Sequence, residues 1–148
     1  MPDQTITVSL TQQRDYQFTV VFCGGVPDLL ADEPAPLGAA HGPSPVQLLA
    51  AAVGNCLSDS LLFALRKYKQ NPEPLSCEID ARVGRNDEGR TRVLAIDARL
   101  KIGVPADTLQ HLGRVLEQFE EFCTVTQSVR AGIPVTVHVS DANGAVLK

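Results

Sequence analysis

One apolar segment, from Gly42 to Lys69, constrains the fold of this chain more than any other part of it. Its sequence is GPSPVQLLAAAVGNCLSDSLLFALRKYK. Ser44 in the N-cap position, Pro45 at the first helical position and Gln47 three residues after the cap form a helix start signal. Asn71-Pro72 forms the stop signal, because proline does not continue a helix. We therefore expect one long helix from Pro45 to about Lys69.

Apolar side chains cover every side of the first four turns of this helix. A helix that is apolar on all sides is normally buried on all sides. A chain of 148 residues is too small to enclose such a helix alone. We therefore expect a second copy of the chain to cover part of it, in a homodimer. The apolar residues are Leu48, Leu49, Ala52, Val53, Leu57, Leu61, Leu62 and Leu65.

Segments that alternate apolar and polar residues predict strands on both sides of the helix. Before the helix, Thr5 to Thr11 and Tyr16 to Phe22 predict two strands joined by a polar turn. The stretch from Asp28 to Pro45 is rich in Pro, Gly and Ala, which indicates a loop. After the helix, Ser76 to Gly84 and Thr91 to Gly103 predict an antiparallel hairpin.

The remaining residues predict two helices and a strand. Pro105 opens a helix whose apolar stripe continues to Cys123. Residues Thr124 to Arg130 predict a short further helix, closed by Gly132. Pro134 to Ser140 predicts the last strand. Antiparallel strands in groups separated by helices indicate an α+β fold.

Length and charge exclude several classes of protein. The chain is about as long as one domain, so we expect a single domain over residues 1–148. A net charge of -4, without a block of like charges, argues against nucleic acid as a partner. The start, MPDQTITVSL, lacks a signal sequence, which favours a cytoplasmic protein. Asp59 and Arg66 interrupt the longest apolar run, so we expect no membrane span.

The four cysteines are widely scattered, at Cys23, Cys56, Cys77 and Cys123. They form no CxxC motif and no Cys/His pair at zinc spacing, so we expect no metal and no cofactor. A disulfide in a cytoplasmic chain is more often transient and catalytic than structural. We interpret Cys23 and Cys77 as structural.

The sequence pattern leaves two interpretations open for Cys56 and Cys123. Free cysteine is often a small apolar residue that only packs. However, Asp59 and Ser60 make the face of Cys56 polar on its C-terminal side, which favours access to the thiol. If the chain breaks after Phe122, Cys123 lies near the N-terminus of the next helix, a position that favours a thiolate.

Two motifs resemble a known family. GPSPVQLLAAAVGNC and, later, FCTVTQSVRAGIPV are similar to the OsmC/Ohr family of osmotically induced and organic hydroperoxide resistance proteins, and DEPAPLG is similar to the linker of one branch. The resemblance implies an intertwined homodimer, with antiparallel sheets around a long buried central helix. It also implies thiol-dependent reduction of organic hydroperoxides at the interface. In that reaction Cys56 is the peroxidatic cysteine and Cys123 the resolving one, and an external dithiol reduces their disulfide.

The resemblance also implies a cation and exposes one departure. The family uses an arginine from the N-terminal strand region beside the thiolate, and Arg14 matches it in placement, with Arg130 as a fallback. Hydroperoxide-resistance members hold that arginine with a glutamate just after the proline that opens the central helix. Val46 and Gln47 stand there instead, and neither is an anion. The carboxylates that could substitute are Glu33, Glu120 and Glu121.

Two functions therefore follow from the sequence. The first is a thiol-dependent peroxidase that reduces organic hydroperoxides in oxidative-stress defence, through a Cys56–Cys123 disulfide. The alternative is a non-catalytic module with the same fold, which binds an apolar small molecule or senses oxidation. The missing anion at Val46 and Gln47 is the feature that favours the alternative.

Overall fold

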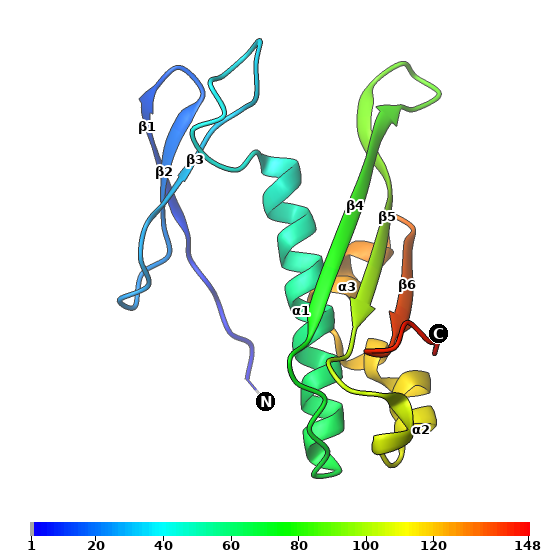
Figure 1. Ribbon diagram of the computed structural model, residues 1–148. Helices are drawn as coiled ribbons and strands as arrows, with labels where there is room; N and C mark the ends of the chain where they lie inside the picture. Colours follow the sequence, from blue (N-terminus) through cyan, green and yellow to red (C-terminus); the bar gives the residue numbers. More distant parts are fainter. Residues whose placement is uncertain (1) are drawn as a thin grey trace. The chain divides into compact units, whose positions relative to one another are not determined.

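The structure, a computed structural model, describes residues 2–148 (Figure 1). Its elements follow the predicted α+β order. The chain divides into two compact units, one ending at Leu48 and the other spanning Leu49–Lys148. The single domain over residues 1–148 stays a prediction.

The first unit holds a three-stranded antiparallel sheet in the order β1-β2-β3. Strand β1 (Ser9–Arg14) begins later than predicted, because Ser9 already pairs with the last residue of β2 (Gln17–Val21) and earlier residues have no partner in that strand. Strand β3 (Leu29–Ala31) corrects the predicted loop from Asp28 to Pro45. Its three residues pair with β2 although the surrounding composition is typical of a loop.

A buried carboxylate organises the rest of the first unit. Asp32 follows β3 and is only 2% exposed. The backbone N–H groups of Glu33, Ala39 and His41 donate to its oxygens over 2.8, 3.3 and 3.0 Å. The hydrogen bond from His41 lowers the pKa of Asp32 most, and this effect outweighs the opposing effect of burial. The segment from residue 32 to residue 41 is therefore folded around one anion.

The second unit contains a mixed sheet in the order β4-β5-β6. Strands β4 (Ser76–Arg85) and β5 (Thr91–Lys101) form the predicted antiparallel hairpin. Strand β6 (Val135–Ser140) pairs with β5 in parallel, so the expected antiparallel arrangement does not extend to it. The helices between β5 and β6 provide the crossover that a parallel pair requires.

The two faces of this sheet differ in chemistry. One carries a charged network in which Arg99 binds Asp80 over 2.7 Å and Asp97 over 3.1 Å, and His138 contacts Asp97. His138 is exposed, as its alternation with neighbouring valines predicts. The other face is apolar and packs against the helices. Its members with little exposed surface are Ile96, Ala98, Leu100, Ile102, Val137 and Val139.

Helix α1 (Pro45–Lys67) begins at the predicted capping box. The N–H of Ser44 donates to Oε1 of Gln47 over 2.9 Å, and the N–H of Gln47 donates to Oγ of Ser44 over 3.3 Å. A single stripe of the helix is fully buried, whereas Phe63 is 72% exposed. The second unit therefore covers only part of the apolar surface of α1. The buried apolar stripe consists of Val53, Leu57, Leu61 and Leu65.

Length and composition alone would also allow α1 to cross a membrane, although the sequence argued against a span. The core helix of a soluble protein passes the same test. Its buried stripe packs in one cluster with the apolar face of the β4-β5-β6 sheet, so we treat α1 as a core helix.

The helix predicted after Pro105 is broken into three pieces. They are the 3₁₀ turn η1 (Ala106–Thr108), α2 (Leu112–Gln118) and the 3₁₀ turn η2 (Phe119–Phe122). The first break extends from Leu109, whose backbone is extended, to His111, whose backbone is left-handed (φ 60°). Helix α3 (Thr124–Arg130) has its predicted bounds, and the extended backbone of Cys123 separates it from η2.

Candidate functional site

The fold of the second unit brings Cys56 and Cys123 together. Cys56 lies in the middle of α1 and is partly exposed, whereas Cys123 is fully buried at the junction between η2 and α3. The two thiols are within hydrogen-bonding reach of each other, and both are free. A partly exposed sulfur therefore touches a buried one, which is the arrangement that a peroxidatic and a resolving cysteine require.

The N-terminus of α3 lies beside Cys56. The backbone N–H groups of Val125 and Thr126 lie close enough to the sulfur of Cys56 to lower its pKa. The predicted chain break after Phe122 is confirmed, and Cys123 occupies the N-cap of α3. Cys123 therefore lies at the N-terminus of a helix, as predicted, and a thiolate at Cys123 stays a prediction.

The environment within the second unit favours a neutral Cys56 thiol. Burial raises its pKa most, and contact with Cys123 raises it further. The amides of Val125 and Thr126 lower the pKa but do not compensate. None of the largest contributions comes from a cation. A cation beside Cys56 would oppose this shift and favour its thiolate.

Arg14, the predicted source of that cation, belongs to the first unit. It is exposed at the end of β1, beside a bulge and opposite Gln17. Glu33, one of its three possible anchors, lies in the same unit. The pairing of Arg14 with Cys56 stays a prediction.

Glu120, another possible anchor for Arg14, is already paired. It accepts a hydrogen bond from Nη2 of Arg130 over 2.7 Å and forms an ion pair with Lys148. Burial raises the pKa of Glu120, but the hydrogen bonds from Lys148 and Arg130 outweigh it, and the net pKa is lowered. Arg130 also donates to the carbonyl of Val135 over 3.2 Å. Both the fallback cation and this anchor are therefore occupied within the second unit, and Glu121 is exposed.

The other two cysteines lie apart from the thiol pair in their contacts. Cys77 packs beside Gly54, its thiol donates to the carbonyl of Glu78 over 3.8 Å, and burial raises its pKa. Gly54 lies two residues from Cys56, on a different side of α1. Cys77 thus contributes to packing, as expected. Cys23 is exposed in a turn with φ 66°, so it fills no core position.

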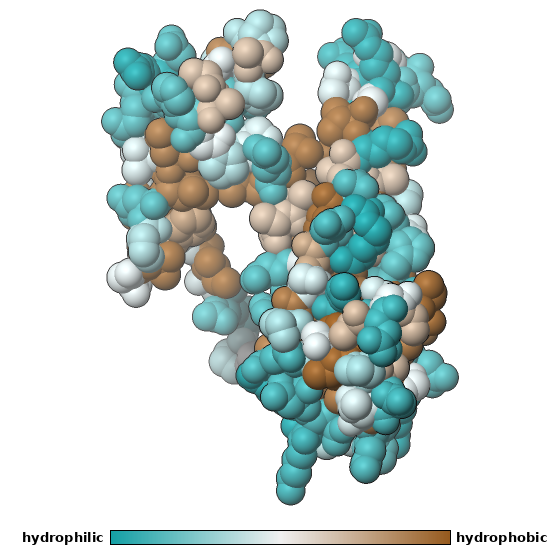
Figure 2. Space-filling view, in the orientation of Figure 1, coloured by the Kyte–Doolittle hydropathy of each residue, from teal (hydrophilic) through white to brown (hydrophobic). Residues whose placement is uncertain are grey.

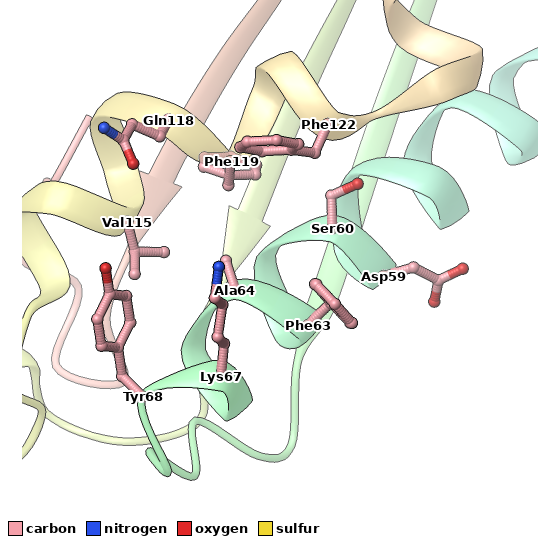
Figure 3. A pocket seen from close by; sticks show the side chains of 10 residues that line it. All are labelled: Asp59, Ser60, Phe63, Ala64, Lys67, Tyr68, Val115, Gln118, Phe119 and Phe122. Carbon is pink, nitrogen blue, oxygen red and sulfur yellow. The ribbon is translucent and has the colours of Figure 1, made fainter. Parts of the chain in front are cut away.

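An apolar groove of about 340 Å³ lies between the C-terminal half of α1 and the α2–η2 segment (Figure 3). It begins at Asp59 and Ser60, about one helical turn beyond Cys56. On its other side Phe122 precedes Cys123 directly and is 73% exposed. The groove is therefore adjacent to the thiol pair although neither thiol lines it. Its further lining residues are Phe63, Ala64, Lys67, Tyr68, Val115, Gln118 and Phe119.

Sequence reasoning missed one polar residue of the site, Thr126. Its side chain is fully buried, and its Oγ1 accepts a hydrogen bond from the thiol of Cys123 over 3.0 Å. A signal was available, because a residue three positions after a helix N-cap points back towards the cap. Among residues 2–148, no three His, Cys, Asp or Glu side chains come together as metal ligands would.

Comparisons with known proteins show the family and the fold. The profile of the OsmC-like protein family matches residues 38–138. No protein in a curated sequence collection matches the chain. Among solved structures, an OsmC-like protein of unknown function from Vibrio cholerae has a TM-score of 0.79 and 21% identity, with 93% of this chain and 100% of that chain covered.

Two further structures are similar over nearly the whole chain. An organic hydroperoxide resistance protein from Elizabethkingia anophelis has a TM-score of 0.73 and 21% identity, covering 95% of this chain and 98% of that one. An organic hydroperoxide resistance protein OsmC from Legionella pneumophila has a TM-score of 0.70 and 18% identity, covering 95% and 99%. The family match, extending over more than half of the sequence, shows that this chain belongs to the OsmC-like protein family.

Proposed function

We propose that this protein is a thiol-dependent peroxidase that reduces organic hydroperoxides in oxidative-stress defence. Its family, which includes organic hydroperoxide resistance proteins, supports a general role in oxidative stress. The observation that carries the finer proposal is the contact between a partly exposed Cys56 thiol and a buried Cys123 thiol. Such a pair has the arrangement needed for a two-cysteine peroxidase cycle.

The cycle begins at the more accessible sulfur. The thiolate of Cys56 attacks one oxygen of the O–O bond, a new S–O bond forms, and the alkoxide leaves and takes a proton to become an alcohol. Cys56 is then a sulfenic acid, oxidised by two electrons. The sulfur of Cys123 attacks the sulfenic sulfur, the S–O bond breaks, and hydroxide leaves as water with the thiol proton of Cys123. An external dithiol reduces the resulting disulfide and is itself oxidised.

The groove supports an organic substrate over hydrogen peroxide. Phe63 and Phe122, which are both exposed, offer apolar surface to the organic part of a hydroperoxide. Burial of apolar area contributes roughly 25 cal/mol per Å², a gain that hydrogen peroxide lacks. The volume of the groove, about 340 Å³, is within the size range of small-molecule sites.

The remaining parts of the proposal concern partners and place. Arg14 supplies the cation that opposes the raised pKa of Cys56. The active form is a homodimer in the cytoplasm, with a small dithiol protein or dithiol cofactor as the reductant. We expect neither nucleic acid nor a membrane as a partner.

Peroxide consumption by reduced protein tests this function. Cumene hydroperoxide should oxidise two thiols of the wild type for each equivalent consumed. Cys56→Ser should abolish consumption, and Cys123→Ser should leave a sulfenic acid that a dione reagent traps. Cys23→Ser is the matched control, because Cys23 is exposed in the other unit. Equal consumption by the wild type and Cys56→Ser would refute the proposal.

A second function is favoured by one specific observation. The pKa of Cys56 is raised, and the side chain of Gln47 accepts a hydrogen bond in the capping box instead of binding an arginine. A module that binds an apolar molecule without turnover would need neither a thiolate nor that anchor. Native mass spectrometry that finds an apolar ligand, together with no consumption of peroxide, would support this alternative.

A further inference from the structure

The hydroxyl of Thr126 is buried without an obvious structural reason. Thr126 has no exposed surface, and its Oγ1 lies 3.0 Å from the sulfur of Cys123. Valine has nearly the same shape and would fill the position without a polar group to satisfy. Its hydrogen bond to the thiol of Cys123 is the only side-chain hydrogen bond that Thr126 forms within residues 2–148. The hydroxyl is therefore specifically matched to that sulfur.

The same residue touches both sulfurs of the pair. Its side chain accepts a hydrogen bond from Cys123, and its backbone N–H lies close enough to Cys56 to lower the pKa of that thiol. Cys123 cannot rely on water for its hydrogen bonding, because it is fully buried. When Cys123 loses its proton, the resulting charge would be unpartnered unless a nearby group donates to it. A hydroxyl can reverse its role, since it accepts from a thiol and donates to a thiolate.

We propose that Thr126 is a catalytic residue of the resolving step, whose hydroxyl orients the Cys123 thiol and donates a hydrogen bond to its sulfur as the thiolate forms. The inference rests on the proposed function and deepens it. In this step Cys123 gives up its proton and its sulfur attacks the sulfenic sulfur of Cys56. The S–S bond forms, the S–O bond breaks, and the departing hydroxide combines with the proton as water. Thr126 gains or loses no atoms, because its hydroxyl only turns towards the sulfur.

The test follows the attack of Cys123 on Cys56 without any peroxide. In a Cys23→Ser, Cys77→Ala background, Ellman's reagent converts Cys56 to a mixed disulfide with thionitrobenzoate. The attack of Cys123 then releases coloured thionitrobenzoate in a first-order reaction. The reaction is followed by stopped flow as a function of pH, in Thr126→Val, Thr126→Ser and a control, Thr124→Val. Thr124 is exposed in the same helix, so its substitution adds a valine without touching the thiols.

Thr126→Val should slow the release of thionitrobenzoate about tenfold at neutral pH, because the forming thiolate of Cys123 loses a hydrogen bond. The pH at which the rate is half-maximal should also rise. Thr126→Ser keeps the hydroxyl and should restore both the rate and the pH profile, whereas Thr124→Val should match the background protein. Thermal unfolding should show Thr126→Val to be as stable as its parent, which separates the chemistry from packing.

Two results would overturn the inference. One is a release by Thr126→Val at the parent rate with an unchanged pH profile. The other is Thr126→Ser as slow as Thr126→Val, which would mean that the methyl group and not the hydroxyl matters. Failure of the wild type to consume hydroperoxide would instead overturn the proposed function, and it would leave the result of this exchange assay intact.

Discussion

At the scale of single residues, the chemistry depends on how Cys56 becomes ionised. Burial raises the pKa of Cys56, so the thiolate fraction is small at neutral pH and increases as the pH rises. The α3 amides that contact this sulfur lower the pKa only in part. The rate of reaction with peroxide should therefore rise with pH through the neutral range, and any added cation should move that rise to lower pH.

Removal of Arg14 tests the source of the cation. We expect Arg14→Gln to slow the reaction of reduced protein with cumene hydroperoxide about tenfold at neutral pH, which corresponds to roughly one pKa unit. The rate should recover at alkaline pH, because the thiolate then forms without help. Arg90→Gln, an exposed arginine in the β4–β5 turn, is the control. A stopped-flow pH profile of Arg14→Gln that overlays the wild type would exclude Arg14 from this role.

At the scale of elements, one ion-pair cluster holds the η2 turn that leads into Cys123. Glu120 in η2 binds Arg130 at the end of α3 and Lys148 beyond β6. The Lys148 ammonium also donates to the carbonyl of Leu116 over 2.8 Å and lies 5.4 Å from the ring centroid of Phe119. The cluster thereby connects three segments next to the resolving cysteine.

Glu120→Gln should destabilise the protein by about 1–2 kcal/mol at neutral pH, because two cations lose their charged partner. The folded-state pKa of Glu120 lies below its ordinary value, so its contribution is present above that value and is lost as the pH falls through the folded-state pKa. Urea unfolding should therefore show a difference in the free energy of unfolding between variant and wild type that disappears at acid pH. Glu121→Gln, at an exposed neighbour, should show no such difference. A difference in the free energy of unfolding that persists at acid pH would mean that the substitution disturbs packing rather than removes a charge interaction.

The sequence predicted the elements whose signals are local. The capping box at Ser44, the break before α3 and the β4–β5 hairpin all depend on neighbouring residues, and all are confirmed. Strand β3 and the parallel pairing of β6 were missed, because both depend on partners distant in sequence.

The same limit applies to the candidate site. The contact between Cys56 and Cys123 was suggested by family resemblance rather than by spacing, because the two residues are 67 positions apart in the sequence. Gly54 shows why spacing was insufficient: a Cβ there would lie 2.7 Å from Cγ1 of Ile79, so the glycine lets α1 approach β4 closely. Such an approach is invisible to a helical pattern. In the sequence, Gly54 indicates only a weak helix former, which destabilises a helix by roughly 1 kcal/mol relative to alanine.

At the scale of the whole molecule, each unit carries large apolar side chains that are exposed. Figure 2 shows apolar side chains gathered over the strands of the first unit, where Leu10 is 60% exposed. Ile6, which precedes β1, is 79% exposed. In the second unit Phe63 and Phe122 are more than 70% exposed. Large apolar patches of this kind are typical of surfaces that a partner covers.

We expect the covering partner to be a second copy of the chain, because the helix that carries Cys56 is apolar beyond the stripe that its own sheet buries. Sedimentation at micromolar concentration should give twice the 15.9 kDa of one chain. Ala52→Lys places a charge on an exposed apolar position of α1, one turn before Cys56, and should shift the protein towards monomer. Glu88→Lys in the β4–β5 turn is the control and should stay dimeric. If the partner shields the thiol of Cys56, the rate of peroxide turnover by Ala52→Lys should fall in proportion to the fraction of monomer. Full turnover by a monomeric variant would show that the reaction does not need the dimer.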